Sequence, residues 1–131
     1  MKYMLDTNIC IYAQKNIGNI ITNIKEHLND GLSISAITLA ELEYGVKNSK
    51  SPDKNLIALL RFLTLVDILP FDSSAADQYG IINTDLRKKG TPIGNMDTLI
   101  AAHAIAEGLT VVTHNTHEFE RVEGIKLEDW Y

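Results

Sequence analysis

The sequence predicts an α/β fold in which a central parallel sheet of about four to five strands lies between two layers of helices. Short apolar runs with strand character alternate with longer segments of helical periodicity, which is the pattern of parallel βαβ units. A chain of 131 residues suits one hydrophobic core and is too short for two. We therefore expect a single domain over residues 1–131.

The expected strands are short, apolar and rich in β-branched residues. The first is buried and ends where Asp6 interrupts the apolar run, and the strand closed by Pro70 is also expected to be buried. The final strand is expected at the sheet edge. The expected strands cover residues 2–5, 32–35, 66–69, 110–113 and 125–128.

The expected helices follow from apolar spacing and from capping signals. Thr38 and Glu41 have the spacing of a capping box, Ser73 or Ser74 is the expected cap of the long helix, and Gly108 is a stop signal. The expected helices cover approximately residues 9–13, 18–28, 37–47, 54–63, 74–89 and 96–106.

Composition narrows the class of protein. Hydrophobic residues make up 45% of the chain and charged residues 22%, as in an ordinary globular protein. The only cysteine, Cys10, cannot form an internal disulfide and is expected to be a small buried hydrophobic residue. No secretory leader or membrane-spanning run is visible, so we expect a cytoplasmic protein with no membrane partner.

The net charge of −5 argues at first against a nucleic-acid partner, which usually requires a basic surface. The objection weakens if several of the acids surround a divalent cation, because they then belong to the site and not to the surface that meets phosphates. Two groups of basic residues remain available for such a surface. They are residues 87–89, and Lys47, Lys50, Lys54 and Arg61.

Polar residues follow the strands where each of them ends. Asp6 follows the first strand, Glu41 lies near the start of the helix after the second, and Asp97 begins a later helix. Asn115 and Glu118 follow the strand over residues 110–113. Ligands of open parallel sheets bind beyond the carboxyl ends of the strands, so these side chains are expected to converge.

Several carboxylates in one place repel one another unless a hard cation such as Mg²⁺ or Mn²⁺ neutralises them. Such a cation activates water and orients a phosphodiester. The alternatives in which these acids have only structural roles are a helix cap for Asp6, a capping-box member for Glu41, and a partner of the helix dipole for Asp97. Histidines do not favour zinc, because His114 and His117 have no Cys or HExxH partner.

Four blocks of the sequence resemble the motifs of PIN-domain toxins of the VapC family. The first three are MLDTN at residues 4–8, SAITLAELEYG at 35–45 and IGNMDTLIAAH at 93–103, and the fourth is VTHNTHEFERV at 112–122. The resemblance extends to the terminal residues 128–131. It implies a PIN-like α/β/α sandwich and RNA cleavage that depends on Mg²⁺ or Mn²⁺.

The resemblance also assigns roles. It makes Asp6, Glu41 and Asp97 metal ligands, with Thr7 and Asn8 orienting the first acid and Thr113 supporting it by a hydroxyl. Many PIN domains have a fourth acid where this chain has Asn115, and Glu118 is the candidate to replace it. One metal ion is therefore better supported than two.

The family further implies a type II toxin–antitoxin operon. The expected substrate is tRNA, cut near the anticodon to leave a 5′-phosphate and a 3′-hydroxyl. The expected partner is a VapB-like antitoxin that blocks the carboxylate pocket and itself binds operator DNA. A homodimer is also expected.

Three other interpretations compete with this one. A phosphotransferase of the haloacid dehalogenase class needs a second Asp where this chain has Asn8. A PIN scaffold that binds RNA or protein without cutting is disfavoured because Asp6, Glu41 and Asp97 are all present. An RNA-processing nuclease that has no antitoxin stays open, since its catalytic residues would be the same.

Overall fold

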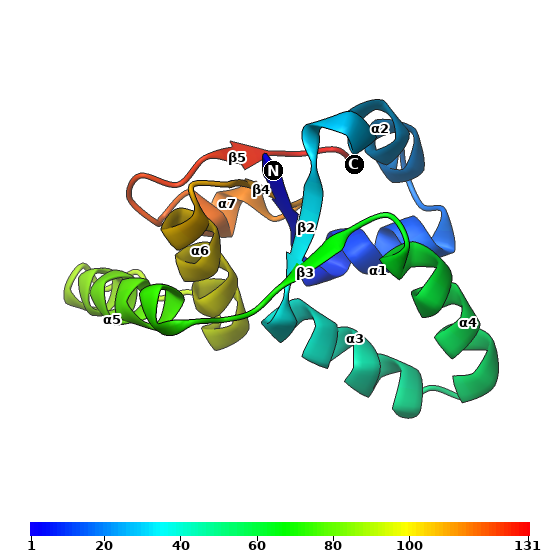
Figure 1. Cartoon of the computed structure of the whole chain (residues 1–131). Helices are drawn as coiled ribbons and strands as arrows, with labels where there is room; N and C mark the ends of the chain where they lie inside the picture. Colours follow the sequence, from blue (N-terminus) through cyan, green and yellow to red (C-terminus); the bar gives the residue numbers. More distant parts are fainter.

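A parallel sheet of five strands forms the centre of the computed structural model, which describes residues 1–131 (Figure 1). The strand order is β3-β2-β1-β4-β5, and each neighbouring pair is parallel. This confirms the expected sheet. The strands are β1 (Tyr3–Leu5), β2 (Leu32–Ser35), β3 (Asp67–Leu69), β4 (Thr110–Val112) and β5 (Leu127–Glu128).

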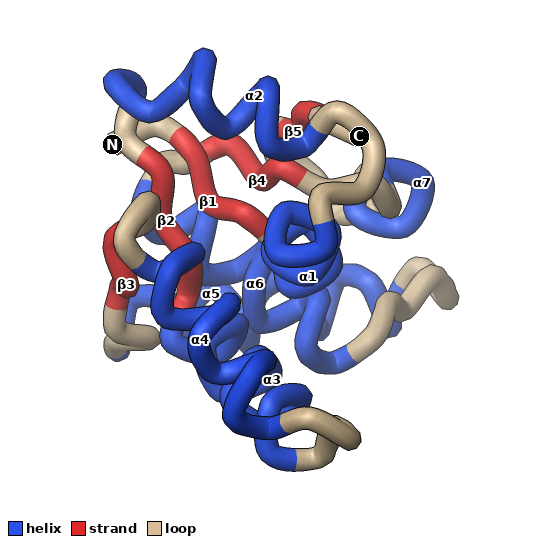
Figure 2. The backbone as a smooth tube through the Cα atoms, turned by 90° about the vertical axis from the view of Figure 1, so that its right-hand side faces the viewer, coloured by secondary structure: helices blue, strands red, loops and turns tan.

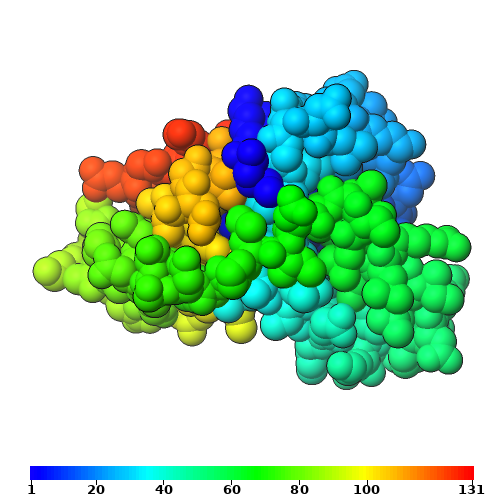
Figure 3. Space-filling model, viewed as in Figure 1, coloured from blue at the N-terminus to red at the C-terminus, as the bar shows by residue number.

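Helices cover both faces of the sheet. One face packs against α1 (Thr7–Lys15), α2 (Ile20–His27), α3 (Ala36–Lys47) and α4 (Pro52–Leu63), and a single 3-10 turn over Leu28–Asp30 follows α2. The other face packs against α5 (Ser73–Lys88), α6 (Asn95–Glu107) and the short α7 (Thr116–Phe119). Figure 3 shows α5 and the α3–α4 pair projecting at opposite ends of the molecule.

The pleat of the strands divides the core between the two faces. Tyr3 and Leu5 point into a cluster of 15 buried residues, whereas Met4 between them points into a cluster of 11. Cys10 is completely buried in the first cluster, as the sequence predicted. Burying each large apolar side chain contributes about 1.5–3 kcal/mol, so both clusters hold the central strands in place.

The position of β1 in the sheet defines where a ligand can bind. From β1 the chain proceeds to β2 and β3 on one side, and it returns to β4 and β5 on the other. Figure 2 shows β2, β1 and β4 side by side. The carboxyl ends of β1 and β4 therefore flank the topological switch point, which is the usual binding position in open parallel sheets.

Three predictions about local structure were wrong. Ser35 caps α3 by accepting a hydrogen bond from the amide of Ile37 at 3.1 Å, so Thr38 and Glu41 form no capping box. Asp72 caps α5 in place of Ser73 or Ser74, because its carboxylate accepts from the amide of Ala75.

The third error concerns β3. It was expected to be buried, but it lies at the sheet edge with Asp67 and Ile68 exposed. An apolar run alone does not reveal whether a strand has one neighbour or two. At the other end of the sheet, β5 is the edge strand that was expected. Gly108 ends α6 with a φ of +69°, as expected for a glycine stop.

None of the helices combines the length and the apolar character that crossing a membrane requires.

Candidate active site

Asp6 lies at the carboxyl end of β1 and is only 4% exposed. Its Oδ1 accepts a hydrogen bond from the amide of Ile9 at 2.9 Å, which makes it the cap of α1. Burial raises the pKa of the Asp6 carboxyl, while the Thr113 hydroxyl and the Ile9 amide oppose that rise. The helix-cap interpretation and the active-site interpretation therefore apply to the same side chain.

Glu41 lies in the second turn of α3, facing the first turn of α1. Its Oε1 accepts a hydrogen bond from the Thr7 hydroxyl at 2.6 Å. Thr7 was expected to orient Asp6, but its hydroxyl instead orients Glu41. The Asn8 side chain was expected to do the same, yet it is exposed and forms no hydrogen bond in the structure. The second residue of α1 thus gives no visible support to the first acid.

Asp97 lies in the first turn of α6 and interacts with Glu118 of α7. Burial raises the pKa of Asp97 to about 7, and a hydrogen bond with Glu118 and the charges of Glu118, Asp6 and Glu41 add to the rise. The pKa of Glu118 is lowered, chiefly by a hydrogen bond from the Gly94 amide at 2.9 Å. The two pKa shifts have opposite signs, so within this pair Asp97 keeps a proton to a higher pH than Glu118 does.

Asn115 connects the two ends of this arrangement. Its backbone amide donates to the Thr113 hydroxyl at 2.9 Å, and its side-chain amide donates to Oε2 of Glu118 at 2.7 Å. Thr113 lies beside Asp6, and Glu118 lies beside Asp97. The hydrogen bonds from Thr113 through Asn115 thus help to position the carboxylate of Glu118.

Two contributors to the site were missed by sequence reasoning. The Gly94 amide is a backbone group, so no side-chain pattern could reveal it. Arg121 donates to the carbonyl of Pro92 at 3.2 Å, and its charge helps to lower the pKa of Glu118. Arg121 lies within the fourth motif block and could have been weighed as a basic residue near the site.

The residues present fit a hard divalent cation. Three carboxylates, those of Glu118, Asp6 and Glu41, influence the ionisation of Asp97, and all of the candidate ligand atoms are oxygens. No group of three His, Cys, Asp or Glu side chains is close enough to form a preformed direct coordination shell. Mg²⁺ keeps several of its waters and takes one or two carboxylates directly, so such a site does not require three touching ligands.

Carboxylates gathered at the switch point of a parallel sheet are the arrangement that a nuclease using a divalent cation requires. The comparisons with known proteins agree, since the PIN domain family matches residues 3–125. The chain therefore belongs to the PIN-domain family, and within it to the VapC ribonucleases, as the following relatives show.

The relatives match over nearly their whole length. A protein of Shigella flexneri named tRNA(fMet)-specific endonuclease VapC is 44% identical over 99% of this chain and 98% of its own. Ribonuclease VapC2 of Rickettsia felis is 46% identical with the same coverage. The crystal structure of VapBC2 from Rickettsia felis, bound to a promoter DNA fragment, superimposes with a TM-score of 0.95 at 43% identity, covering both chains completely.

A second solved structure, of DNA-bound VapBC from Salmonella typhimurium, gives a TM-score of 0.94 at 43% identity and covers 100% of this chain and 99% of that one. These matches confirm both the fold and the family that the four motif blocks indicated. They also confirm that the chain is an endoribonuclease of a family that is generally metal-dependent.

Proposed function

We propose that this chain is the toxin of a toxin–antitoxin pair and cleaves tRNA with Mg²⁺ or Mn²⁺ as cofactor, residues 1–131 acting as one PIN domain. The observation that supports this most directly is the convergence of Asp6, Glu41, Asp97 and Glu118 at the switch point. Burial raises the pKa of Asp97 to about 7, and the repulsion among these carboxylates adds to the rise. A divalent cation would relieve that repulsion.

Asp6, Asp97 and Glu41 are the proposed metal ligands. When bound, the cation supplies Lewis-acid activation of a water and neutralises charge on the phosphodiester. Glu118 is held ionised by the Gly94 amide and by Asn115, so it is placed to accept a proton at its carboxylate. To act as a ligand, Asp97 would have to be ionised, so its proton would pass to solvent when a cation is bound. The expected products carry a 5′-phosphate and a 3′-hydroxyl.

The proposed substrate is initiator tRNA, because the relatives from Shigella flexneri and Salmonella typhimurium are both named tRNA(fMet)-specific endonuclease VapC. A tRNA substrate implies that the enzyme works in the cytoplasm. The test is to incubate the purified chain with initiator tRNA and with elongator methionine tRNA in Mg²⁺, Mn²⁺ or EDTA, and to map the ends of the products. Cleavage of the initiator tRNA alone, abolished by EDTA, is expected. Equal cleavage of both tRNAs would overturn the proposed specificity.

The proposed protein partner is a VapB-like antitoxin, as in the solved VapBC complexes from Rickettsia felis and Salmonella typhimurium. A groove of about 270 Å³ between α1, α3 and α4 suits an extended apolar segment, and Glu41 is one of its lining residues. An Arg or Lys of that segment could then neutralise the carboxylates. Other lining residues are Ile11, Gln14, Leu42, Val46 and Ala58.

We further propose that the chain forms a homodimer and reaches operator DNA only through the antitoxin. Co-expression with the adjacent reading frame is expected to yield a complex that no longer cuts tRNA. A cleaving nuclease that copurifies with no neighbouring gene product would instead favour an RNA-processing enzyme without antitoxin.

A further inference from the structure

We propose that the stacked rings of His114 and Tyr131 form a binding site for one unpaired base of the RNA, next to the phosphodiester that is cut. The proposal rests on the proposed function, because it places the base beside the carboxylates described above. The two rings lie 4.0 Å apart between centroids, with an interplanar angle of 16°. Both are open to solvent, since the His114 side chain is 46% exposed and Tyr131 is 42% exposed.

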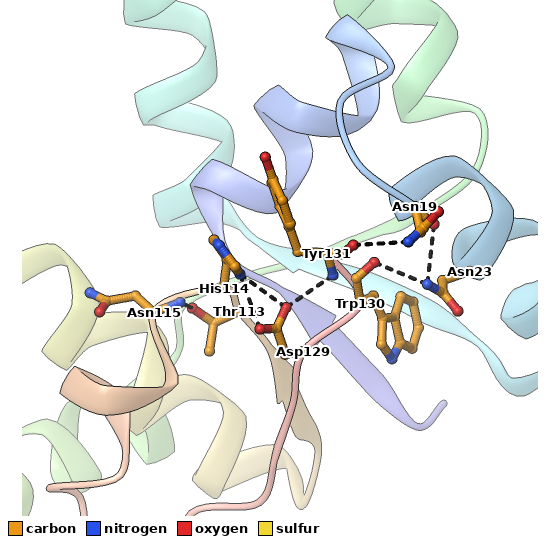
Figure 4. Close-up of polar contacts among 8 residues, drawn as sticks. All are labelled: Asn19, Asn23, Thr113, His114, Asn115, Asp129, Trp130 and Tyr131. Atoms are coloured by element: carbon orange, nitrogen blue, oxygen red, sulfur yellow. Dashed lines mark hydrogen bonds and ion pairs between the residues drawn. The ribbon is translucent and has the colours of Figure 1, made fainter.

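The stack is rigidly built although it involves the last residue of the chain (Figure 4). The Asp129 carboxylate contacts Nδ1 of His114 at 3.0 Å and accepts from the amide of Tyr131 at 2.9 Å. The backbone amide and the side-chain amide of Asn19 both donate to a terminal oxygen of Tyr131. Tyr12 meets the Tyr131 ring edge-on, with centroids 5.4 Å apart. Residues near a chain end are usually poorly ordered unless contacts hold them, and the contacts above hold Tyr131 in place.

The two rings are about equally exposed, and Tyr12 also meets the His114 ring edge-on with centroids 6.4 Å apart, but the surroundings of their outer faces differ. Gly18 lies so close to Tyr131 that an added Cβ would stand 3.4 Å from both Cδ atoms of the ring. Tyr131 is thus crowded by Gly18 and covered by His114. The base is therefore expected to stack on the outer face of the His114 imidazole, with Tyr131 and Asp129 acting as positioning residues behind it.

The location of His114 ties the stack to the active site. In sequence it stands between Thr113, whose hydroxyl lies beside Asp6, and Asn115, which holds Glu118. Figure 4 shows these three residues in succession, with Asp129 below His114. A phosphodiester at the carboxylates would therefore bring one of its flanking bases within reach of the imidazole.

The chemistry of the surface favours a nucleobase. Unpaired RNA bases stack on aromatic and histidine rings, and one such contact is worth about 1–3 kcal/mol, which corresponds to roughly a 5- to 150-fold effect on affinity. A preorganised ring loses little freedom on binding, so most of that energy would appear as affinity. A cationic side chain of a protein partner could also contact these rings, and the experiment distinguishes the two.

The experiment compares His114→Phe, which keeps a ring, with His114→Gln, which keeps hydrogen-bonding groups but has no ring. Both are placed in an Asp6→Asn background in Mg²⁺, so that binding is measured without cleavage. The probe is a short single-stranded RNA containing 2-aminopurine, whose fluorescence is quenched by stacking. His117→Gln is the matched control, because His117 lies in the same region with 87% side-chain exposure and no aromatic neighbour.

We expect the 2-aminopurine fluorescence to be quenched and the RNA to bind tightly when residue 114 is His or Phe. With His114→Gln, we expect the affinity for the RNA to fall about tenfold or more. Tyr131→Leu should weaken binding as well, whereas Tyr131→Phe and His117→Gln should not. The melting temperatures of the His114 variants should lie within a few degrees of their parent, because the side chain is about half exposed and its contacts lie at the surface.

The proposal would be overturned if His114→Gln bound the RNA as tightly as its parent. It would also be overturned if His114→Phe lost as much affinity as His114→Gln, because that result would assign His114 a polar role. Weakened antitoxin inhibition with unchanged RNA binding would assign the rings to the protein partner instead. The proposed function is tested separately, since failure to cut tRNA by the unsubstituted chain leaves the stacking result intact.

Discussion

The two ends of the carboxylate ring differ in how their charge is held. Asp6 is almost completely buried, yet an amide and a hydroxyl satisfy its oxygens. Asp97 is partly buried, and burial raises its pKa to about 7 with help from three neighbouring carboxylates. The fold therefore fixes the position of Asp6, whereas burial and the neighbouring carboxylates together determine the charge of Asp97. A cation would change the second end far more than the first.

The largest expected effect is at the fixed end. Removing a residue that only supports a metal ligand typically lowers activity by about 10–100-fold. Asp6→Ala removes a proposed ligand itself, so it should lower the rate of tRNA cleavage by at least about a hundredfold. Because Asp6 also caps α1, Asp6→Ala should lower the free energy of unfolding by about 0.5–2 kcal/mol. Initial cleavage rates and urea unfolding measure the two effects.

Asp6→Asn separates the two roles of this residue, because an Asn side chain still caps a helix. It should be nearly as inactive as Asp6→Ala but close to the unsubstituted chain in stability. If folded Asp6→Ala protein cuts tRNA as fast as its parent in Mg²⁺, Asp6 is not a catalytic residue.

The next effect concerns the proton at Asp97. Its pKa is raised in the folded chain, so the folded state binds more protons than the unfolded state between about pH 4 and 7. Metal-free stability should therefore fall as the pH rises through this window. Asp97→Asn resembles the protonated form and still has a donor for Glu118, so it should be more stable than its parent at pH 8 and similar at pH 5.

Solvent screening at this partly exposed group limits the gain to the order of 1 kcal/mol, or a few degrees in Tm. Thermal unfolding in EDTA at both pH values measures it. Added Mg²⁺ should stabilise the unsubstituted chain at pH 8 and have much less effect on Asp97→Asn. A variant that is no more stable than its parent at pH 8 would mean that burial and the neighbouring carboxylates do not raise the pKa of Asp97 as inferred.

A third effect is expected at Asn115, which joins the two ends. Asn115→Asp removes the donor to Glu118 and adds a negative charge beside it. Mn²⁺ should therefore bind more tightly, by about tenfold if the added attraction is about 1.4 kcal/mol, while the metal-free protein becomes less stable. Calorimetric titration with Mn²⁺ measures the first and thermal unfolding the second. Unchanged affinity would place Asn115 outside the reach of the cation, as a support of Glu118 alone.

Much of this comparison could be predicted from the sequence, and the exceptions have physical reasons. Strand ends place Asp6 and Thr113, because parallel topology brings those ends to one edge. The direction of the Thr7 hydroxyl could not be predicted, since it depends on how α1 packs against α3. The ionisation of Asp97 could not be predicted either, because it depends on burial and on distances among residues that are far apart in sequence.

The last prediction concerns stability, and it tests a buried hydrogen bond between the helices that contain Glu41 and Asp97. Ser35 caps α3, which contains Glu41, and its hydroxyl lies 2.8 Å from Nδ1 of His103 on α6, which contains Asp97. His103 is buried, its Nε2 has no hydrogen-bond partner, and burial lowers its pKa. The imidazole is therefore neutral at pH 7, and Ser35 is its hydrogen-bonding partner.

Ser35→Ala should cost about 1–3 kcal/mol of stability, because it removes a helix cap and leaves a second ring nitrogen of His103 unpaired. His103→Leu removes both nitrogens at once. Combining it with Ser35→Ala should therefore cost less than the sum of the two single changes, by about 1 kcal/mol. Urea unfolding of the four proteins completes the cycle. Strict additivity would mean that the Ser35–His103 contact does not link the helices that contain Glu41 and Asp97, and that packing alone sets the distance between the two ends.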